Sequence, residues 1–137
     1  MAHDEHAGLF GLEGRRLLLV EDNDACAEAV RHWLEICGAR VTTADTVGSA
    51  VARTHREKPD LMLVDVYLPD GTAWDVVERV RASVPEGARL PAVVITGAPS
   101  PAVARSARAH GVRHVIAKPI APEALAAALT DCLQTAA

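Results

Sequence analysis

The sequence has few aromatic residues, few cysteines and little excess charge. It contains two Trp, one Tyr and one Phe among 137 residues, so its core has to be aliphatic. Its three cysteines are an odd number without a Cys-x-x-Cys pair: Cys26, Cys37 and Cys132. This pattern indicates buried thiols in a reducing cytoplasm rather than a disulfide framework or a zinc site. A net charge of −4 argues against sequence-independent nucleic-acid binding, which requires a basic face.

Long apolar runs are also missing. No uninterrupted run approaches the roughly 20 residues that a membrane-spanning helix needs. The N-terminus lacks the apolar centre of a signal peptide, so we expect neither a membrane segment nor export. In contrast, 50% of the residues are hydrophobic and 23% are charged, which excludes a disordered chain. The length suits one domain that buries about two-thirds of its unfolded surface.

The first 14 residues show no hydrophobic periodicity, and we expect them to form a flexible tail. They contain Gly8, Gly11 and Gly14. This glycine spacing is similar to that of a nucleotide-binding loop, but such a loop follows a strand. Here the glycines precede the first apolar run, which excludes that interpretation.

After Arg15 the pattern becomes regular. Four short apolar runs are continuous rather than alternating, as in strands buried on both faces of a parallel sheet: 17–20, 61–64, 92–95 and 115–117. A fifth segment, 39–44, alternates more and predicts an edge strand.

Helical periodicity separates these runs. It predicts helices over about 24–37, 47–56, 100–111 and 122–133, and a further helix that opens with a capping pattern at 72–75. Strand and helix therefore alternate five times without a break in composition. This alternation predicts an α/β fold, a (βα)5 doubly wound parallel sheet of the flavodoxin-like class with strand order 2-1-3-4-5.

Polar side chains follow four of the five predicted strands. Glu21 and Asp22 come after the first strand, Asp65 ends the third, Thr96 ends the fourth, and Lys118 follows the fifth. The carboxyl ends of parallel strands lie at one edge of a sheet, so we expect these groups to lie together. Converging carboxylates repel unless a cation lies among them, and an all-oxygen site suits Mg²⁺. We expect Asp22 and Asp65 to be direct ligands and Glu21 to act partly through water.

The same edge has the groups needed for phosphoryl transfer. Lys118 is one of only two lysines, against 12 arginines, and can pair with a carboxylate at rest and with phosphate oxygens after transfer. The hydroxyl of Thr96 can turn towards the same oxygens. Asp65 would then be the nucleophile that forms an acyl phosphate. Each residue alone also has a purely structural interpretation, as a helix cap, a turn former or a solvated strand exit; their joint placement favours the site.

Four segments together resemble the receiver domain of two-component response regulators. They are LLVEDN at 18–23, PDLMLVDVYLPDG at 59–71, VITG at 94–97 and AKPI at 117–120. The resemblance covers roughly residues 15–133. It implies that Asp65 accepts a phosphoryl group from a histidine kinase or a histidine phosphotransfer domain.

The resemblance also implies roles for the other site residues. Glu21 and Asp22 match the acidic pair that binds Mg²⁺, and the main-chain carbonyl of Tyr67 matches a further ligand. Thr96 matches the switch hydroxyl, and Lys118 the lysine that contacts the phosphoryl group.

At the level of the whole chain, the absence of periodicity predicts a flexible tail over 1–14, and the resemblance implies a receiver domain over 15–137. We expect a cytoplasmic phosphoacceptor domain with self-catalysed phosphotransfer and slow autodephosphorylation, and not an enzyme in its own right. A dimer through the face formed by the fourth helix, the fifth strand and the fifth helix is one candidate assembly; membrane and direct nucleic-acid contacts are not expected. The opening Val-Glu-Asp-Asn favours a receiver from a hybrid histidine kinase, and a stand-alone regulator is the alternative.

Three positions are expected to tune this activity. Val115 stands where receivers usually have Tyr or Phe, the aromatic rotamer switch coupled to the hydroxyl, so signalling through that face is expected to differ. Tyr67 and Ala98 lie two residues after Asp65 and Thr96 respectively, and in the family such positions flank the approach of water to the phosphoryl group.

Two other functions share parts of this pattern. Phosphatases similar to haloacid dehalogenase hydrolases also combine Asp, Thr or Ser, Lys and an acidic pair, but their nucleophile lies in an early Asp-x-Asp motif. Here Tyr67 takes the place of the second Asp, so the general acid is missing. A receiver fold that acts as an interaction module without phosphate control is the other alternative; the complete set of polar groups opposes it, and Val115 supports it.

Overall fold

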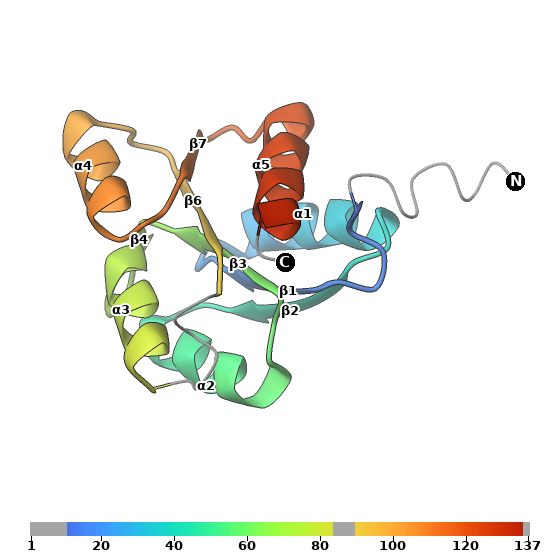
Figure 1. Cartoon of the computed structure of the whole chain (residues 1–137), viewed down its shortest axis with the longest axis horizontal. Coiled ribbons are helices and arrows are strands. Elements are labelled where there is room, and N and C mark those ends of the chain that lie inside the picture. Colours follow the sequence, from blue (N-terminus) through green and yellow to red (C-terminus); the bar gives the residue numbers. More distant parts are fainter. Residues whose placement is uncertain (1–10, 84–89, 136–137) are drawn as a thin grey trace, which may run out of the picture.

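The computed structural model describes residues 11–83 and 90–135, which form a parallel sheet covered by helices on both faces (Figure 1). The five strands of the sheet lie in the order β2-β1-β3-β6-β7. Their bounds are β1 (Arg16–Val20), β2 (Arg40–Ala44), β3 (Leu61–Asp65), β6 (Ala92–Thr96) and β7 (His114–Ala117). The predicted order 2-1-3-4-5 is therefore confirmed, with the predicted edge strand at the edge of the sheet.

The helices also occur where the hydrophobic periodicity predicts them. They are α1 (Asp24–Ile36), α2 (Val47–Glu57), α3 (Ala73–Ser83), α4 (Pro101–Ala109) and α5 (Pro122–Thr135). Local signals set their ends: the side chains of Asn23, Thr46 and Ser100 cap α1, α2 and α4 at their N-termini. None of the helices in the described ranges has the length and apolar character needed to cross a membrane.

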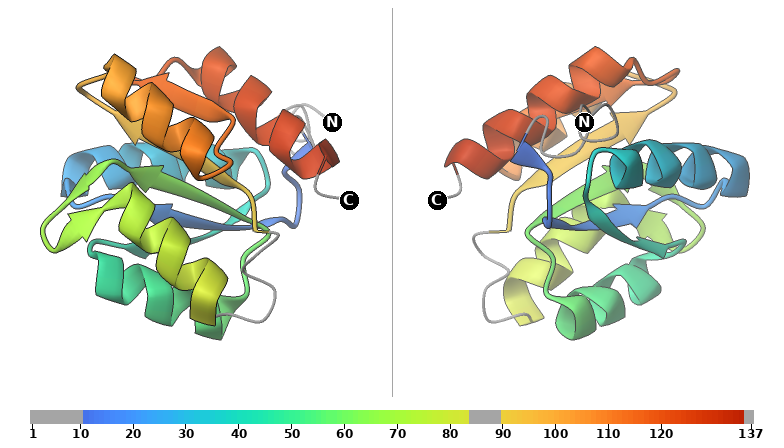
Figure 2. Two further views of the ribbon diagram at one scale, coloured as in Figure 1. Left: turned by 60° about the vertical axis from the view of Figure 1, so that its left-hand side comes forward. Right: turned by 90° about the vertical axis from the view of Figure 1, so that its right-hand side faces the viewer.

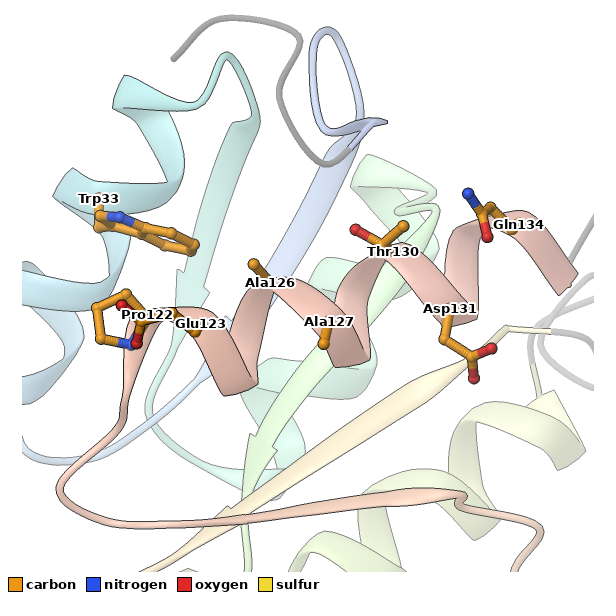
Figure 3. Close-up of a pocket in the computed structure, with 8 residues that line it drawn as sticks. All are labelled: Trp33, Pro122, Glu123, Ala126, Ala127, Thr130, Asp131 and Gln134. Atoms are coloured by element: carbon orange, nitrogen blue, oxygen red, sulfur yellow. The ribbon is translucent and has the colours of Figure 1, made fainter. Parts of the chain in front are cut away.

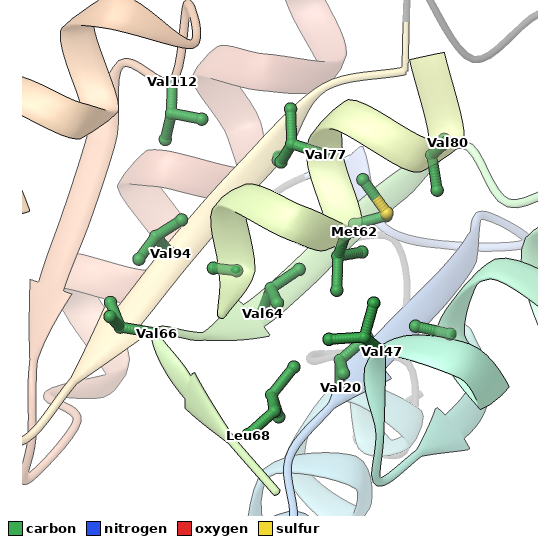
Figure 4. Close-up of a cluster of buried hydrophobic side chains, with 14 of the residues drawn as sticks. Val20, Val47, Met62, Val64, Val66, Leu68, Val77, Val80, Val94 and Val112 are labelled. Atoms are coloured by element: carbon green, nitrogen blue, oxygen red, sulfur yellow. The ribbon is translucent and has the colours of Figure 1, made fainter. Parts of the chain in front are cut away.

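The sheet divides the hydrophobic core into two layers. Alternate residues of one strand point to opposite faces, so in β3 the side chains of Met62 and Val64 join one layer while Leu61 and Leu63 join the other. The first layer packs under α2, α3 and α4 (Figure 4), and the second under α1 and α5, an arrangement visible in Figure 2. Burial on both faces explains why these strands are continuous apolar runs.

The N-terminal boundary differs from the sequence-based expectation. Residues 1–10 of the predicted tail lie outside the described residues, as do 136–137 of the predicted domain. Leu12, which the prediction assigned to the tail, is fully buried in the layer under α1 and α5. The Gly14 N–H donates to the carbonyl of Gly38 at 2.9 Å, which attaches this segment to the end of α1. The packed part of the chain therefore begins before Arg15.

A small hairpin between β3 and α3 was not predicted. Its strands are β4 (Tyr67–Leu68) and β5 (Gly71–Thr72), paired antiparallel. Two-residue strands are too short for a periodic pattern, so hydrophobicity gave no signal for them. Gly71 is required sterically, because a Cβ atom there would lie 2.5 Å from Oδ2 of Asp75 and 3.1 Å from Cγ2 of Val47. The hairpin therefore packs tightly against the starts of α2 and α3.

His110 fixes the C-terminal end of α4 to α3. Its Nδ1 lies 2.7 Å from the carbonyl oxygen of Ser106, and its Nε2 lies 2.7 Å from a carboxylate oxygen of Glu78. The ring also stacks on Trp74 with a centroid distance of 5.4 Å. Both ring nitrogens face acceptors, so only the doubly protonated imidazolium satisfies both contacts. The hydrogen bonds to Glu78 and Ser106 raise the pKa of His110.

We expect this contact to make stability depend on pH. Because the pKa of folded His110 is raised, its contribution is fully present below the unfolded value of about 6.5 and is lost as the pH rises through the folded pKa. His110→Gln should therefore lower the free energy of unfolding more at pH 5.5 than at pH 8.5, by up to about 1 kcal/mol because the pair is partly exposed. Urea unfolding at both pH values measures this. His55→Gln, which removes an exposed histidine from α2, is the matched control, and equal pH dependence of the two variants would contradict the assignment.

Candidate functional site

The carboxyl ends of four neighbouring strands bring the predicted polar residues to one edge of the sheet. Asp65 and Thr96 are the last residues of β3 and β6, while Glu21 and Lys118 directly follow β1 and β7. The register places Val20 beside Val64. Glu21 and Asp65 therefore lie next to one another at this edge, as the sequence predicts.

Lys118 joins two of these carboxylates in a hydrogen-bonded cluster, which we call the lysine–carboxylate cluster (Glu21, Asp65 and Lys118). Its Nζ donates to Oε1 of Glu21 at 2.6 Å and to Oδ2 of Asp65. The carboxylates are nearly inaccessible, with Glu21 3% and Asp65 6% exposed. Burial alone would lower the pKa of Lys118, but the hydrogen bonds and charges of Asp65 and Glu21 outweigh it and raise the pKa. Lys118 is therefore held as a cation between two buried carboxyl groups.

The second oxygen of each carboxylate accepts from the main chain two residues further on. Oδ1 of Asp65 accepts from the Tyr67 N–H at 3.0 Å, and Oε2 of Glu21 accepts from the Asn23 N–H at 3.2 Å. Each carboxylate is thus held between one ammonium and one amide, which fixes its orientation.

Thr96 lies beside this cluster, completely buried. Its Oγ1 accepts from the Ala98 N–H at 3.0 Å, and its carbonyl accepts from the Lys118 N–H at 2.9 Å. A hydroxyl that accepts still has its own proton to donate. Thr96 therefore connects the segment after β6 to the segment after β7, whose Lys118–Pro119 peptide bond is cis.

The other predicted residues lie around the cluster rather than in it. Asp22 is exposed and, within the described part of the chain, adds no hydrogen bond to the cluster. Tyr67 contributes its amide, while its side chain is 58% exposed; Ala98 is also exposed. Val115 pairs with Val94 in the sheet register and packs against the core layer under α4. Its position therefore connects the β6–β7 edge with α4.

The donor set has the chemistry that Mg²⁺ prefers, although the side chains are not arranged around a cation. Among residues 11–83 and 90–135, no group of three or more His, Cys, Asp or Glu side chains forms a metal-holding cluster. The physical reason is Lys118, whose ammonium lies between Glu21 and Asp65 and supplies the positive charge. The carboxylates of Glu21, Asp22 and Asp65 are hard oxygen donors, so these residues fit Mg²⁺ if Lys118 gives up part of its contact.

Two residues near the site were missed by sequence reasoning. The Cys26 thiol hydrogen-bonds to Glu21, and burial together with that bond and the charge of Glu21 raises the pKa of Cys26 to about 11. Cys26 therefore stays a neutral thiol. The Asp70 carboxylate accepts from the first amides of α2. The Pro-Asp-Gly turn indicates a bend at Asp70, but no local signal indicates a contact with a helix that begins 23 residues earlier.

A groove between α1 and α5 is a separate feature. It has a volume of about 490 Å³, and Trp33 on α1 faces Pro122 at the start of α5 (Figure 3). Small residues of α5, including Ala126 and Ala127, line its floor. The groove shares no residue with the lysine–carboxylate cluster, so it is not part of the candidate site.

Comparison with known families gives one match over most of the chain. The model of the response regulator receiver domain matches residues 17–130. Among curated relatives, a 14.6 kDa protein of Leptolyngbya boryana is 31% identical over 106 residues, which are 77% of this chain and 80% of that protein. The photosynthetic apparatus regulatory protein RegA of Rhodobacter capsulatus is 34% identical, over 87% of this chain and 62% of RegA.

Longer relatives match over only part of their length. The regulatory protein LuxO of Vibrio vulnificus is 30% identical over 86% of this chain, which spans 25% of LuxO. The chain also spans 33% of TcrX, a probable transcriptional regulatory protein of Mycobacterium tuberculosis. The shared part is thus one segment of these larger regulators.

Solved structures agree with the sequence relatives. A CheY-like receiver domain protein of Methanospirillum hungatei superimposes with a TM-score of 0.81 at 26% identity, covering 90% of this chain and 97% of that one. The chemotaxis protein CheY4 of Vibrio cholerae gives a TM-score of 0.82 at 28% identity, covering 88% and 99%.

Removing the charge of Lys118 tests the cluster itself. Lys118→Met leaves two buried carboxylates facing each other without a counter-charge, and we expect a loss on the order of 3 kcal/mol in the free energy of unfolding at pH 7. Urea unfolding measures this loss. The control is Lys58→Met, which removes the chain's other, exposed lysine; an equally small loss in both variants would show that the cluster does not depend on Lys118.

Proposed function

The chain belongs to the response regulator receiver domain family, and from this premise we propose that it accepts a phosphoryl group on Asp65. The donor in this proposal is the phosphohistidine of a histidine kinase or a histidine phosphotransfer domain. The observation that carries the proposal is the contact between Lys118 and Asp65 at the carboxyl ends of β7 and β3. It places an oriented carboxylate next to a cation that can receive phosphate oxygens.

The transfer itself exchanges one bond at phosphorus for another. A carboxylate oxygen of Asp65 attacks the phosphorus, the bond from phosphorus to the donor's imidazole nitrogen breaks, and the imidazole leaves with that electron pair. The product is an acyl phosphate on Asp65. Lys118 keeps its contact with the new group, now through a phosphoryl oxygen, and the Thr96 hydroxyl donates to another. Lys118 already contacts Asp65 before the reaction, whereas the Thr96 hydroxyl has to turn towards the new group.

Glu21, Asp22 and Asp65, with the main-chain carbonyl of Tyr67, would hold a Mg²⁺ ion in this proposal. When bound, the ion supplies positive charge that offsets the charge of the phosphoryl oxygens. Two features of the residues support this assignment: all donors are oxygens, and Asp22 stands exposed beside the buried pair. An open site of this kind binds Mg²⁺ weakly, because several ligands remain water.

The signal is proposed to leave through Thr96 and α4. A hydroxyl that turns towards phosphate gives up its bond from the Ala98 amide and loosens the segment between β6 and α4. Val115 has no aromatic ring, so it cannot make the ring rotation typical of the family. In this proposal the movement of the segment between β6 and α4 takes the place of that rotation. A cytoplasmic location is part of the proposal and is supported by the three free cysteines.

Chemical phosphorylation tests the acceptor. With Mg²⁺ and a small acyl phosphodonor, we expect one phosphoryl group on the wild-type chain and none on Asp65→Asn, measured by intact-protein mass spectrometry. Asp60→Asn is the control, since Asp60 lies at the opposite end of the same strand and should leave labelling unchanged. Full labelling of Asp65→Asn would overturn the assignment, and an unlabelled wild type would favour the interaction-module alternative.

The lifetime of the acyl phosphate is expected to depend on Tyr67. Hydrolysis needs a water in line with the phosphorus–oxygen bond. In this proposal the ring of Tyr67, two residues after Asp65, shields the new phosphoryl group from an attacking water, and a phenol is a poor general base. Ala98 has no group that orients a water. We therefore expect Tyr67→Asn to lose its phosphoryl group several-fold faster than wild type after removal of the donor.

The matched control is Ile36→Asn. Ile36 and Tyr67 are the two large hydrophobic side chains exposed in the described ranges, and Ile36 lies at the end of α1, away from the acceptor. This variant should decay at the wild-type rate. Slower decay of Tyr67→Asn would mean that the phenol assists hydrolysis rather than shielding the phosphoryl group.

A further inference from the structure

The carboxylate of Asp70 connects the segment after the phosphoacceptor to helix α2. Its Oδ1 accepts from the Val47 N–H at 2.6 Å, and its Oδ2 accepts from the Gly48 N–H at 3.1 Å. Asp70 stands in the turn between β4 and β5, five residues after Asp65. One side chain therefore bridges two elements that lie more than 20 residues apart in the sequence.

Asp70 meets a need that α2 cannot meet alone. The first N–H groups of a helix have no partner within it. The side chain of the N-cap residue Thr46 accepts from the Ser49 N–H at 3.0 Å. The two amides before Ser49, those of Val47 and Gly48, donate to Asp70, whose negative charge also suits a helix N-terminus. These two amides lower the pKa of Asp70, so its carboxylate is ionised at neutral pH.

The same carboxylate holds the hairpin in place. A two-stranded hairpin is marginally stable on its own, and β4–β5 has only two paired positions, Tyr67 with Thr72 and Leu68 with Gly71. Leu68 packs into the core layer beside Val47 (Figure 4). Asp70 thus adds two charged hydrogen bonds to a short element and ties it to a helix.

The hairpin positions the main chain of Tyr67 beside Asp65, the proposed phosphoacceptor. The first residue of β4 is Tyr67, whose N–H donates to Oδ1 of Asp65. In the proposed function the main-chain carbonyl of Tyr67 would also be a ligand of Mg²⁺. A small displacement of this residue would therefore disturb the orientation of the Asp65 carboxylate and the Mg²⁺ site at the same time.

We propose that Asp70 is a positioning residue for phosphoryl transfer to Asp65, acting by anchoring the β4–β5 hairpin to the N-terminus of α2. This inference rests on the proposed function. It assigns Asp70 no contact with the phosphoryl group; its effect passes through the main chain of Tyr67. Such preorganisation matters because small misplacements of reacting groups slow a transfer strongly.

If Asp70 only capped α2, its role would be merely structural. Variants of Thr46, the other cap of α2, distinguish capping from positioning of the hairpin. Thr46→Ala removes a cap from α2 but leaves the bond between α2 and the hairpin intact. Asp70→Ala removes both a cap and the bond. Asp70→Asn keeps an oxygen that accepts from one of the two amides, so it should restore part of what Asp70→Ala loses.

The experiment measures the rate of labelling of Asp65 by a small acyl phosphodonor at subsaturating Mg²⁺, with all variants folded. We expect Asp70→Ala to be labelled about tenfold more slowly than wild type, Asp70→Asn to be intermediate, and Thr46→Ala to keep the wild-type rate although its urea midpoint falls. Hydrogen exchange of the Tyr67 amide in the unphosphorylated protein should follow the same order, fastest in Asp70→Ala.

Equal labelling rates and equal Tyr67 exchange in Asp70→Ala and Thr46→Ala would overturn the inference and reduce Asp70 to a helix cap. If the wild-type protein is still phosphorylated on Asp65 in that experiment, the proposed function is supported although the inference about Asp70 is wrong. An unlabelled wild type overturns the proposed function instead, and the positioning role falls with it.

Discussion

The ion pair of Lys118 with two buried carboxylates is the interaction on which the rest of the site depends. Glu21 and Asp65 lie on adjacent strands and are almost inaccessible, so their charges would repel strongly without a cation between them. Lys118 reaches them from the far side of β6 and supplies that cation. This arrangement holds the Asp65 carboxylate against the ammonium of Lys118, and it requires that three strand ends stay in register.

The two-layered aliphatic core provides that register. Strands buried on both faces cannot shift by one residue without moving their side chains into the opposite layer, so the edge residues are held in place. The scarcity of aromatic residues extends to β7, where Val115 packs against the core layer under α4 without an aromatic ring. The end of α4 is joined to α3 by the contact of His110 with Glu78.

Individual hydrogen bonds orient the polar groups in the loops at this edge. The Tyr67 and Asn23 amides orient the two carboxylates, and the Ala98 amide orients Thr96, each from a position two residues after its acceptor. Asp70 adds a long-range contact to this local set by joining the hairpin to α2. Each of these groups is therefore oriented by its own hydrogen bond.

The sequence by itself determined the fold class, the order of the strands, most helix ends and the four strand ends that form the site. These features follow from hydrophobic period, capping residues and the general geometry of parallel sheets, all of which are local or topological. The tertiary structure alone decided which groups touch. That Lys118 bridges Glu21 and Asp65, that Leu12 is buried, and that Asp70 caps a distant helix are contacts between segments far apart in the chain. No local pattern encodes them, because each depends on distances set only when the helices and strands have packed.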